Sequence, residues 1–334
     1  MSEAGGVRRL KAGSSPHIAA SLTARGIMAW VLAALAPSLL WALWNMGTPA
    51  LLVAAGSLTG AVGTEFAWNA IAKKRHTLGD LTAVLTGVLL AMTLPPYTPW
   101  WMAFAGGVVA IGLGKMLFGG LGWNLFNPAL VGRAMIVISW AGVLALQPNG
   151  GWFRTLGMEG VGELDAVSGA TPLGLAAADR AAAGGYGFQT SSLYGDLLFR
   201  NLSGSIGEIS AALLIAGGLV LVAVRIIDWR IPAGYVGTMA VLSAAFGGDP
   251  VFHMLAGGLM IGAFYMATDY VSSPMSPNAR LLFGVGCGVF NALGRFFGSM
   301  PEATTFAILF MNGLAPMLDR AFVPRTYGWV SRSE

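Results

Sequence analysis

The chain consists of long apolar runs, almost free of charge, separated by short connections that are rich in glycine and proline. A hydrocarbon core about 30 Å thick takes roughly 20 apolar residues per helix. We therefore predict an all-α polytopic membrane protein with about ten transmembrane helices, the third and seventh shorter than the rest. The predicted spans are 27–44, 49–71, 81–94, 99–118, 127–146, 206–226, 233–246, 251–270, 281–297 and 304–322.

Composition and charge support this topology, since 55% of the residues are hydrophobic and only 10% are charged. Lysine and arginine collect on alternate connections, and such residues favour the cytoplasmic side of a bacterial inner membrane. This rule places both tails, 1–26 and 323–334, in the cytoplasm and the 147–205 loop in the periplasm. The net charge of +4 then reflects topology, and no nucleic-acid partner is expected.

Five predicted spans lie on each side of that loop, in residues 27–146 and 206–322, and the two halves share an order of features. An odd number of spans per half predicts inverted repeats, which commonly place a ligand or ion route at their interface. Glycine pairs also serve close helix packing alone. The matching features are Gly106-Gly107 with a break at 119–128, and Gly257-Gly258 with a break at 272–277.

The periplasmic loop contains a short motif with a chemical interpretation. The motif resembles the sequence that a flavin transferase modifies in redox-driven ion pumps, where FMN is joined through its phosphate to the last threonine, here Thr171. Alternatively, Thr171 followed by Pro172 is a plain helix start, with threonine as N-cap and proline in the first turn. The candidate attachment residues are Asp165, Ser168, Gly169, Ala170 and Thr171.

A second informative segment is the glycine-rich break at 112–128. Met116 follows Lys115 where a phosphate-binding loop requires serine or threonine, so a Walker motif is excluded. Irregular backbone at membrane depth is tolerated where it is buried in protein or lines a polar cavity. Asn124 and Asn127 offer donors and acceptors that match the edge of an isoalloxazine ring.

Acidic residues in or beside predicted spans are costly and are therefore functional candidates. Their alternatives are structural, such as an ion pair of Asp319 with Arg320 or a favourable helix-dipole position. Cys287 is the only cysteine, so neither an iron–sulfur cluster nor any other metal site is expected. The acidic residues are Glu65, Asp80, Glu208, Asp269, Glu302 and Asp319; the ion-pathway candidates are Asp80, Asp269, Asp319 and Glu208.

Five segments, in order, resemble the D subunit of the Rnf electron-transport complex, which is related to the B subunit of the sodium-pumping NADH:quinone oxidoreductase. The resemblance implies covalent FMN on Thr171, non-covalent riboflavin near Asn124 and Asn127, and ion uptake at Asp80, Asp269 and Asp319. The matching segments are 115–132, 165–173, 204–208, 267–274 and 306–319.

The expected function is a flavin-carrying membrane subunit of a ferredoxin:NAD⁺ oxidoreductase complex, passing single electrons in a reaction coupled to Na⁺ or H⁺ transport. The chain has no dinucleotide fingerprint, so it requires partners. We expect other membrane subunits, a second flavinylated subunit, iron–sulfur subunits and a periplasmic flavin transferase. The alternatives are a flavin-free channel or secondary transporter, in which Thr171 only caps a helix, and a structural scaffold.

Overall fold

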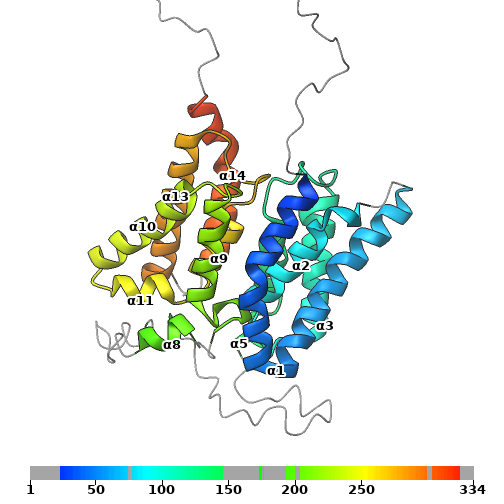
Figure 1. Ribbon diagram of the computed structural model, residues 1–334, viewed down its shortest axis with the longest axis horizontal. Helices are drawn as coiled ribbons and strands as arrows, with labels where there is room; N and C mark the ends of the chain where they lie inside the picture. The colour runs from blue at the N-terminus through cyan, green and yellow to red at the C-terminus, as the bar shows by residue number, and fades with distance from the viewer. Residues whose placement is uncertain are drawn as a thin grey trace, which may run out of the picture.

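A computed structural model describes residues 23–73, 77–145, 173–174, 176, 193–199, 204–298 and 303–323, and their regular structure is helical throughout (Figure 1). Each predicted apolar segment coincides with one or more helices, so the all-α prediction is confirmed for this part of the chain. The helices are α1 (Ala24–Ile71), η1 (Leu78–Asp80), α2 (Thr82–Thr93), α3 (Trp100–Ile111), η2 (Gly112–Met116), α4 (Pro128–Ser139), α5 (Ala141–Ala145), α8 (Tyr194–Phe199), η5 (Ile206–Glu208), α9 (Ala211–Ala223), α10 (Arg230–Ala245), α11 (Pro250–Leu255), α12 (Leu259–Ile261), η6 (Gly262–Met266), α13 (Pro277–Phe297) and α14 (Thr304–Ala321).

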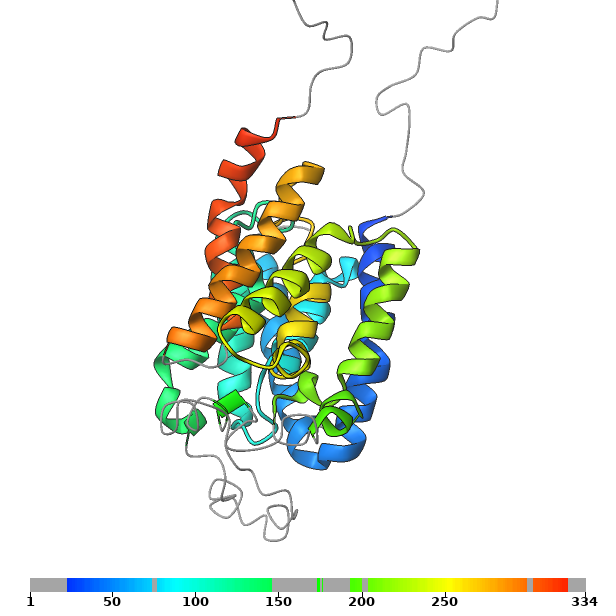
Figure 2. The same cartoon turned by 90° about the vertical axis from the view of Figure 1, so that its left-hand side faces the viewer.

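Helix α1 contains the first two predicted spans. Gly47 interrupts it with φ of 65° and ψ of −147°, a conformation that glycine adopts easily because it has no Cβ. The chain reverses direction at this point, so that α1 has a descending and an ascending arm (Figures 1 and 2). The predicted connection between the two spans therefore lies where the structure has its turn.

Among the described residues, α1 is the one helix that is long and apolar enough to cross a membrane by length and composition alone. Shorter apolar helices cover Thr82–Thr93, Trp100–Met116, Pro128–Ser139 and Ala211–Ala223. Other predicted spans are broken by irregular backbone: Ala256 is extended and Gly257 has φ of 71°, which divides the 251–270 segment into α11, α12 and η6. Ten separate spans remain a prediction.

The helices form two groups that meet through α9 and α1 and through α14 and α4 (Figure 1). Helices α1 to α5 make one group, α10 to α14 make the other, and α9 packs against α1. The start of α1 and the end of α14 lie at one end of the molecule, whereas α5 and α8, which flank the 147–205 loop in sequence, lie at the opposite end (Figures 1 and 2). We call these the tail end and the loop end.

Glycines allow the closest helix crossings. The pairs α1–α3 and α10–α13 are the most extensive helix contacts among the described residues. A Cβ on Gly60 would lie 2.3 Å from the carbonyl oxygen of Phe104 in α3, and one on Gly284 would lie 2.5 Å from that of Ile231 in α10. Small residues let helix backbones approach in this way, which strengthens packing without requiring a solvent-driven hydrophobic effect.

Gly60→Ala should lower the unfolding midpoint of the purified protein, because overpacking a tight contact costs about 1–3 kcal/mol. Gly63→Ala is the matched control: Gly63 lies on the same helix, and a Cβ added there would meet nothing within 4 Å, while alanine is favoured by helix propensity. Thermal unfolding in detergent measures both variants. Equal unfolding midpoints for the two variants would contradict the conclusion that backbone contact at Gly60 limits how closely α1 and α3 approach each other.

Candidate functional site

A pocket at the tail end lies between the two groups of helices. Its enclosed volume is about 70 Å³, and the space around that volume opens to solvent. The walls come from the start of α1, from α2, η2 and α9, and from the connections after η2 and η6. Its polar lining includes Thr82, Lys115, Asn124, Asn127, Thr268 and Asp269.

Both predicted flavin-contacting asparagines line this pocket, but their side chains are used differently. Asn127 caps α4, its Oδ1 accepting from the backbone N–H of Ala129 at 3.0 Å, and its Nδ2 donates to the carbonyl oxygen of Met266 at 3.1 Å. Asn124 donates through Nδ2 to the carbonyl oxygen of Phe126 at 3.1 Å. Within the described residues its Oδ1 accepts no hydrogen bond. Asn124 is therefore the better placed of the two to contact a ligand.

Two of the predicted ion-pathway carboxylates belong to this region. Asp269 lines the pocket and accepts a hydrogen bond from the Ser272 hydroxyl at 2.8 Å. Asp80 stands just behind the wall, where its Oδ1 accepts from the backbone N–H and the hydroxyl of Thr82 at 2.8 and 2.6 Å. Asp80 and Asp269, for which the family resemblance implies ion uptake, therefore lie at the same end of the molecule.

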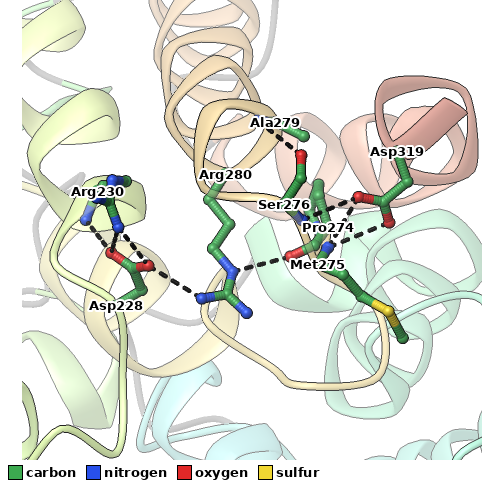
Figure 3. Close-up of polar contacts among 8 residues, drawn as sticks. All are labelled: Asp228, Arg230, Pro274, Met275, Ser276, Ala279, Arg280 and Asp319. Atoms are coloured by element: carbon green, nitrogen blue, oxygen red, sulfur yellow. Dashed lines mark hydrogen bonds and ion pairs between the residues drawn. The ribbon is translucent and has the colours of Figure 1, made fainter. Parts of the chain in front are cut away.

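The other two carboxylates lie elsewhere. Asp319 accepts from the backbone N–H groups of Met275 at 2.9 Å and Ser276 at 3.2 Å, so it fastens α14 to the connection before α13 (Figure 3). The expected alternative, an ion pair with Arg320, does not form within the described part of the chain. Glu208 is buried on η5 and accepts from the Ser205 hydroxyl at 2.7 Å.

The structure also contains a buried ion pair that the sequence interpretation missed. Lys115 on the π-turn η2 lies 2.8 Å from Glu65 on α1, and the two side chains are 3% and 0% exposed. The sequence marks Glu65 as one of several acidic candidates and Lys115 only as part of a glycine-rich break. A single acid and a single base in different apolar spans do carry a signal, because buried charges at such depth usually pair with one another.

Hydroxyl groups extend this pair into a chain of polar contacts. Lys115 also donates to the Thr82 hydroxyl, which itself donates to Asp80. On the other side, the Thr77 hydroxyl donates to Glu65. Since Thr77 is exposed and Lys115 lines the pocket, the chain connects the tail-end surface with the pocket interior.

The predicted flavin attachment motif lies outside the described residues. This applies to all of its members, Asp165, Ser168, Gly169, Ala170 and Thr171. Glu302 also lies outside them.

The fold and the pocket define a class: an all-helical protein in which two helix groups enclose a polar pocket backed by a buried ion pair. Comparison with protein families makes the assignment particular. The chain belongs to the NQR2, RnfD, RnfE family, whose model matches residues 11–328.

Similar proteins cover nearly the whole chain. The D subunit of the Na⁺-translocating ferredoxin:NAD⁺ oxidoreductase complex of Acetobacterium woodii is 40% identical over 323 residues, 96% of this chain and 95% of that protein. The D subunit of the proton-translocating ferredoxin:NAD⁺ oxidoreductase complex of Clostridium ljungdahlii is 39% identical over 327 residues, 94% and 95% of the two chains. The D subunit of the ion-translocating oxidoreductase complex of Stutzerimonas stutzeri is 40% identical over 330 residues, 92% and 93% of the two chains.

Glu65→Gln and Lys115→Met should each destabilise the protein, because removing one partner of a buried ion pair leaves an uncompensated charge and costs about 3–5 kcal/mol. The double variant should lose much less than the sum of the two. Thermal unfolding of all four forms gives the coupling energy as a double-mutant cycle. Purely additive losses would mean that the two charges do not stabilise each other.

Proposed function

We propose that this protein is the D subunit of an Rnf-type, ion-translocating ferredoxin:NAD⁺ oxidoreductase and carries flavin within it. The observation that carries the proposal is membership of the family over residues 11–328, together with near-full-length similarity to proteins named as this subunit. The remaining membrane, flavinylated and iron–sulfur subunits of such a complex are the proposed partners. On its own the chain would not oxidise ferredoxin or reduce NAD⁺.

The proposed location is the bacterial inner membrane, with several spans. Support comes from the outer surface of α1, where large apolar side chains are exposed: Leu40 is 64%, Trp44 83% and Ile71 83% exposed. Large apolar surfaces of this kind are unusual in contact with water and suit a lipid environment. We propose a cytoplasmic tail end and a periplasmic loop end, which agrees with the opposite positions of the two ends in Figure 2.

We propose that the two halves are inverted repeats. The alignment between them uses segments other than the Gly106-Gly107 and Gly257-Gly258 pairs. Four of five residues agree between Gly60-Ala61-Val62-Gly63-Thr64 on α1 and Gly234-Tyr235-Val236-Gly237-Thr238 on α10. The basic residue after Gly114 in η2 likewise matches the one after Gly294 in α13. This pairing spans an odd number of predicted helices, as inversion requires, whereas the Gly-Gly pairing spans an even number. It also relates the crossing α1–α3 to α10–α13.

Two flavins are proposed. FMN would be joined by a periplasmic flavin transferase to Thr171 through a phosphoester, and bound flavin supplies one-electron transfer. A second, non-covalent riboflavin would occupy the tail-end pocket. The Oδ1 atom of Asn124, which accepts no hydrogen bond from the described residues, fits an N–H donor of the ring edge, while Asn127 holds the pocket wall through its cap of α4.

Cation movement is proposed to use carboxylates on both sides. At the tail end, Asp80 and Asp269 would receive the cation, and the Glu65–Lys115 chain beside them would respond to its charge. Asp319 keeps the Asp269 connection in place, and Glu208 is the candidate at the loop end. The proposed ion is Na⁺ or H⁺, because similar proteins named for each are 40% and 39% identical to this chain.

The flavin proposal is tested by Thr171→Ala in protein produced together with its maturation enzymes. Native protein should show flavin fluorescence on a denaturing gel, and the variant should lose that fluorescence completely because the phosphoester oxygen is gone. Ser168→Ala is the matched control and should retain it. Unmodified tryptic peptides from the native 147–205 loop would contradict the assignment of FMN to Thr171 and favour a flavin-free channel or transporter.

The ion pathway is tested by Asp80→Asn in the purified complex reconstituted into vesicles. Asparagine keeps a side-chain oxygen that can accept from the Thr82 backbone N–H but loses the charge, so ferredoxin-driven cation uptake should fall about tenfold, equivalent to about 1.4 kcal/mol. Asp249→Asn is the control, because Asp249 caps α11 through Val251 in the same way. If both variants lose uptake equally, the effect comes from helix capping and Asp80 has no special part in it.

A further inference from the structure

A second pocket at the tail end collects three arginines. Its volume is about 360 Å³, and it lies between the end of α9, the start of α10 and the connection that leads into α13. Arg225, Arg230 and Arg280 line it with a single acidic residue, Asp228. It adjoins the proposed riboflavin pocket, with which it shares Ile227, Thr268 and Tyr270, but it has a different set of charged residues, because Lys115 and Asp269 do not line it.

Two of the guanidinium groups are held in place before any ligand arrives (Figure 3). Asp228 accepts from Nη1 of Arg230 and from Nη1 of Arg280, each at 3.0 Å, and Nε of Arg280 donates to the carbonyl oxygen of Pro274 at 3.0 Å. An arginine has five N–H donors, so both groups keep donors for a ligand. Their side chains are 36% and 32% exposed.

The pocket retains a positive charge. Burial raises the pKa of Asp228, but hydrogen bonds from the Arg230 backbone and from the Arg280 and Arg230 side chains outweigh it, and the pKa lies below its usual value. The carboxylate is therefore ionised at neutral pH and offsets one of the three arginines. Arg225 is exposed, with φ of 61°, and has no ion pair with any described residue.

Apolar surface adjoins this charge. Trp229 is 57% exposed and its ring lies 5.4 Å from the guanidinium carbon of Arg230. Along α9, Leu219, Val220 and Val224 are 56%, 47% and 39% exposed. Tryptophan favours the boundary between lipid and water, and basic pockets between helices on the cytoplasmic side suit anionic headgroups. A soluble anion would use the arginines and leave this apolar surface in water.

We propose that Arg225, Arg230 and Arg280 bind the phosphate group of an anionic phospholipid whose acyl chains lie along the exposed face of α9. The proposal rests on the membrane location given above and is independent of the flavins. The ligand class is a diacyl phospholipid with a net negative headgroup, such as phosphatidylglycerol.

The test measures lipid retained by the purified native complex in neutral detergent, using phosphatidylglycerol and phosphatidylcholine with identical acyl chains. Phosphatidylglycerol should be retained in preference. Arg225→Gln should weaken its binding about fivefold, the effect of one basic residue near an anionic surface. Arg225 makes no side-chain hydrogen bond to described residues, so this variant should fold normally.

Arg320→Gln is the matched control, since Arg320 is an exposed base near the end of α14 that does not line the pocket. It should leave binding unchanged. Equal retention of the two lipids, or equal loss in both variants, overturns the proposal. So does competition by inorganic phosphate at the lipid's own affinity, which would indicate an anion site without a lipid. Flavin fluorescence at Thr171 is followed in parallel, so failure of the flavin assignment is recognised separately.

Discussion

The Glu65–Lys115 ion pair is the constraint around which the tail end of the structure is arranged. Taking either charge out of water alone costs several kcal/mol, and the pair is tolerable only when its remaining hydrogen-bonding capacity is satisfied. Thr77 and Thr82 do this from the two ends of the α1–α2 connection. The pair therefore fixes the ascending arm of α1, the start of α2 and η2 relative to one another. Of these elements, the start of α2 and Lys115 of η2 also form one wall of the proposed riboflavin pocket. The π-turn of η2 is part of the same arrangement, because Gly114 approaches the start of α4 so closely that a Cβ would lie 2.9 Å from the Cα of Pro128. A larger residue would push η2 away from α4 and so disturb the position of Lys115.

The length of each apolar run was enough to predict where the helices lie, because a helix that is buried or in contact with lipid must consist mainly of apolar residues. It did not predict how they break. The 251–270 segment has the composition of one helix, yet Gly257 takes a positive φ that only the packed structure demands. The repeat register proposed above rests on the similarity of segments on α1 and α10, whereas the more conspicuous Gly-Gly pairs indicate a different pairing.

The site was predicted in part. Asn124 and Asn127, predicted as flavin contacts, line the same pocket as Asp269, predicted as an ion-pathway residue, and the sequence did not predict that they would lie together. Asp319 instead accepts hydrogen bonds from backbone N–H groups. The sequence does not predict which way a backbone N–H group points, so this contact could not be predicted. Glu65 and Lys115 are far apart along the chain, and only the crossing of α1 with η2 shows that they are partners.

Asn127 has a mechanical consequence. Its backbone N–H donates to Asn312 of α14, its side chain donates to Met266 of η6, and Asn312 donates in turn to the carbonyl oxygen of Ser272. These buried contacts hold the irregular segment after η2 and the irregular segment after η6 in fixed positions relative to each other. Rocking one half against the other as a rigid block would leave several of these buried groups without a hydrogen-bond partner, which costs about 1–3 kcal/mol for each group. The proposed cation passage would thus be better served by small local gates than by rocking of one half against the other.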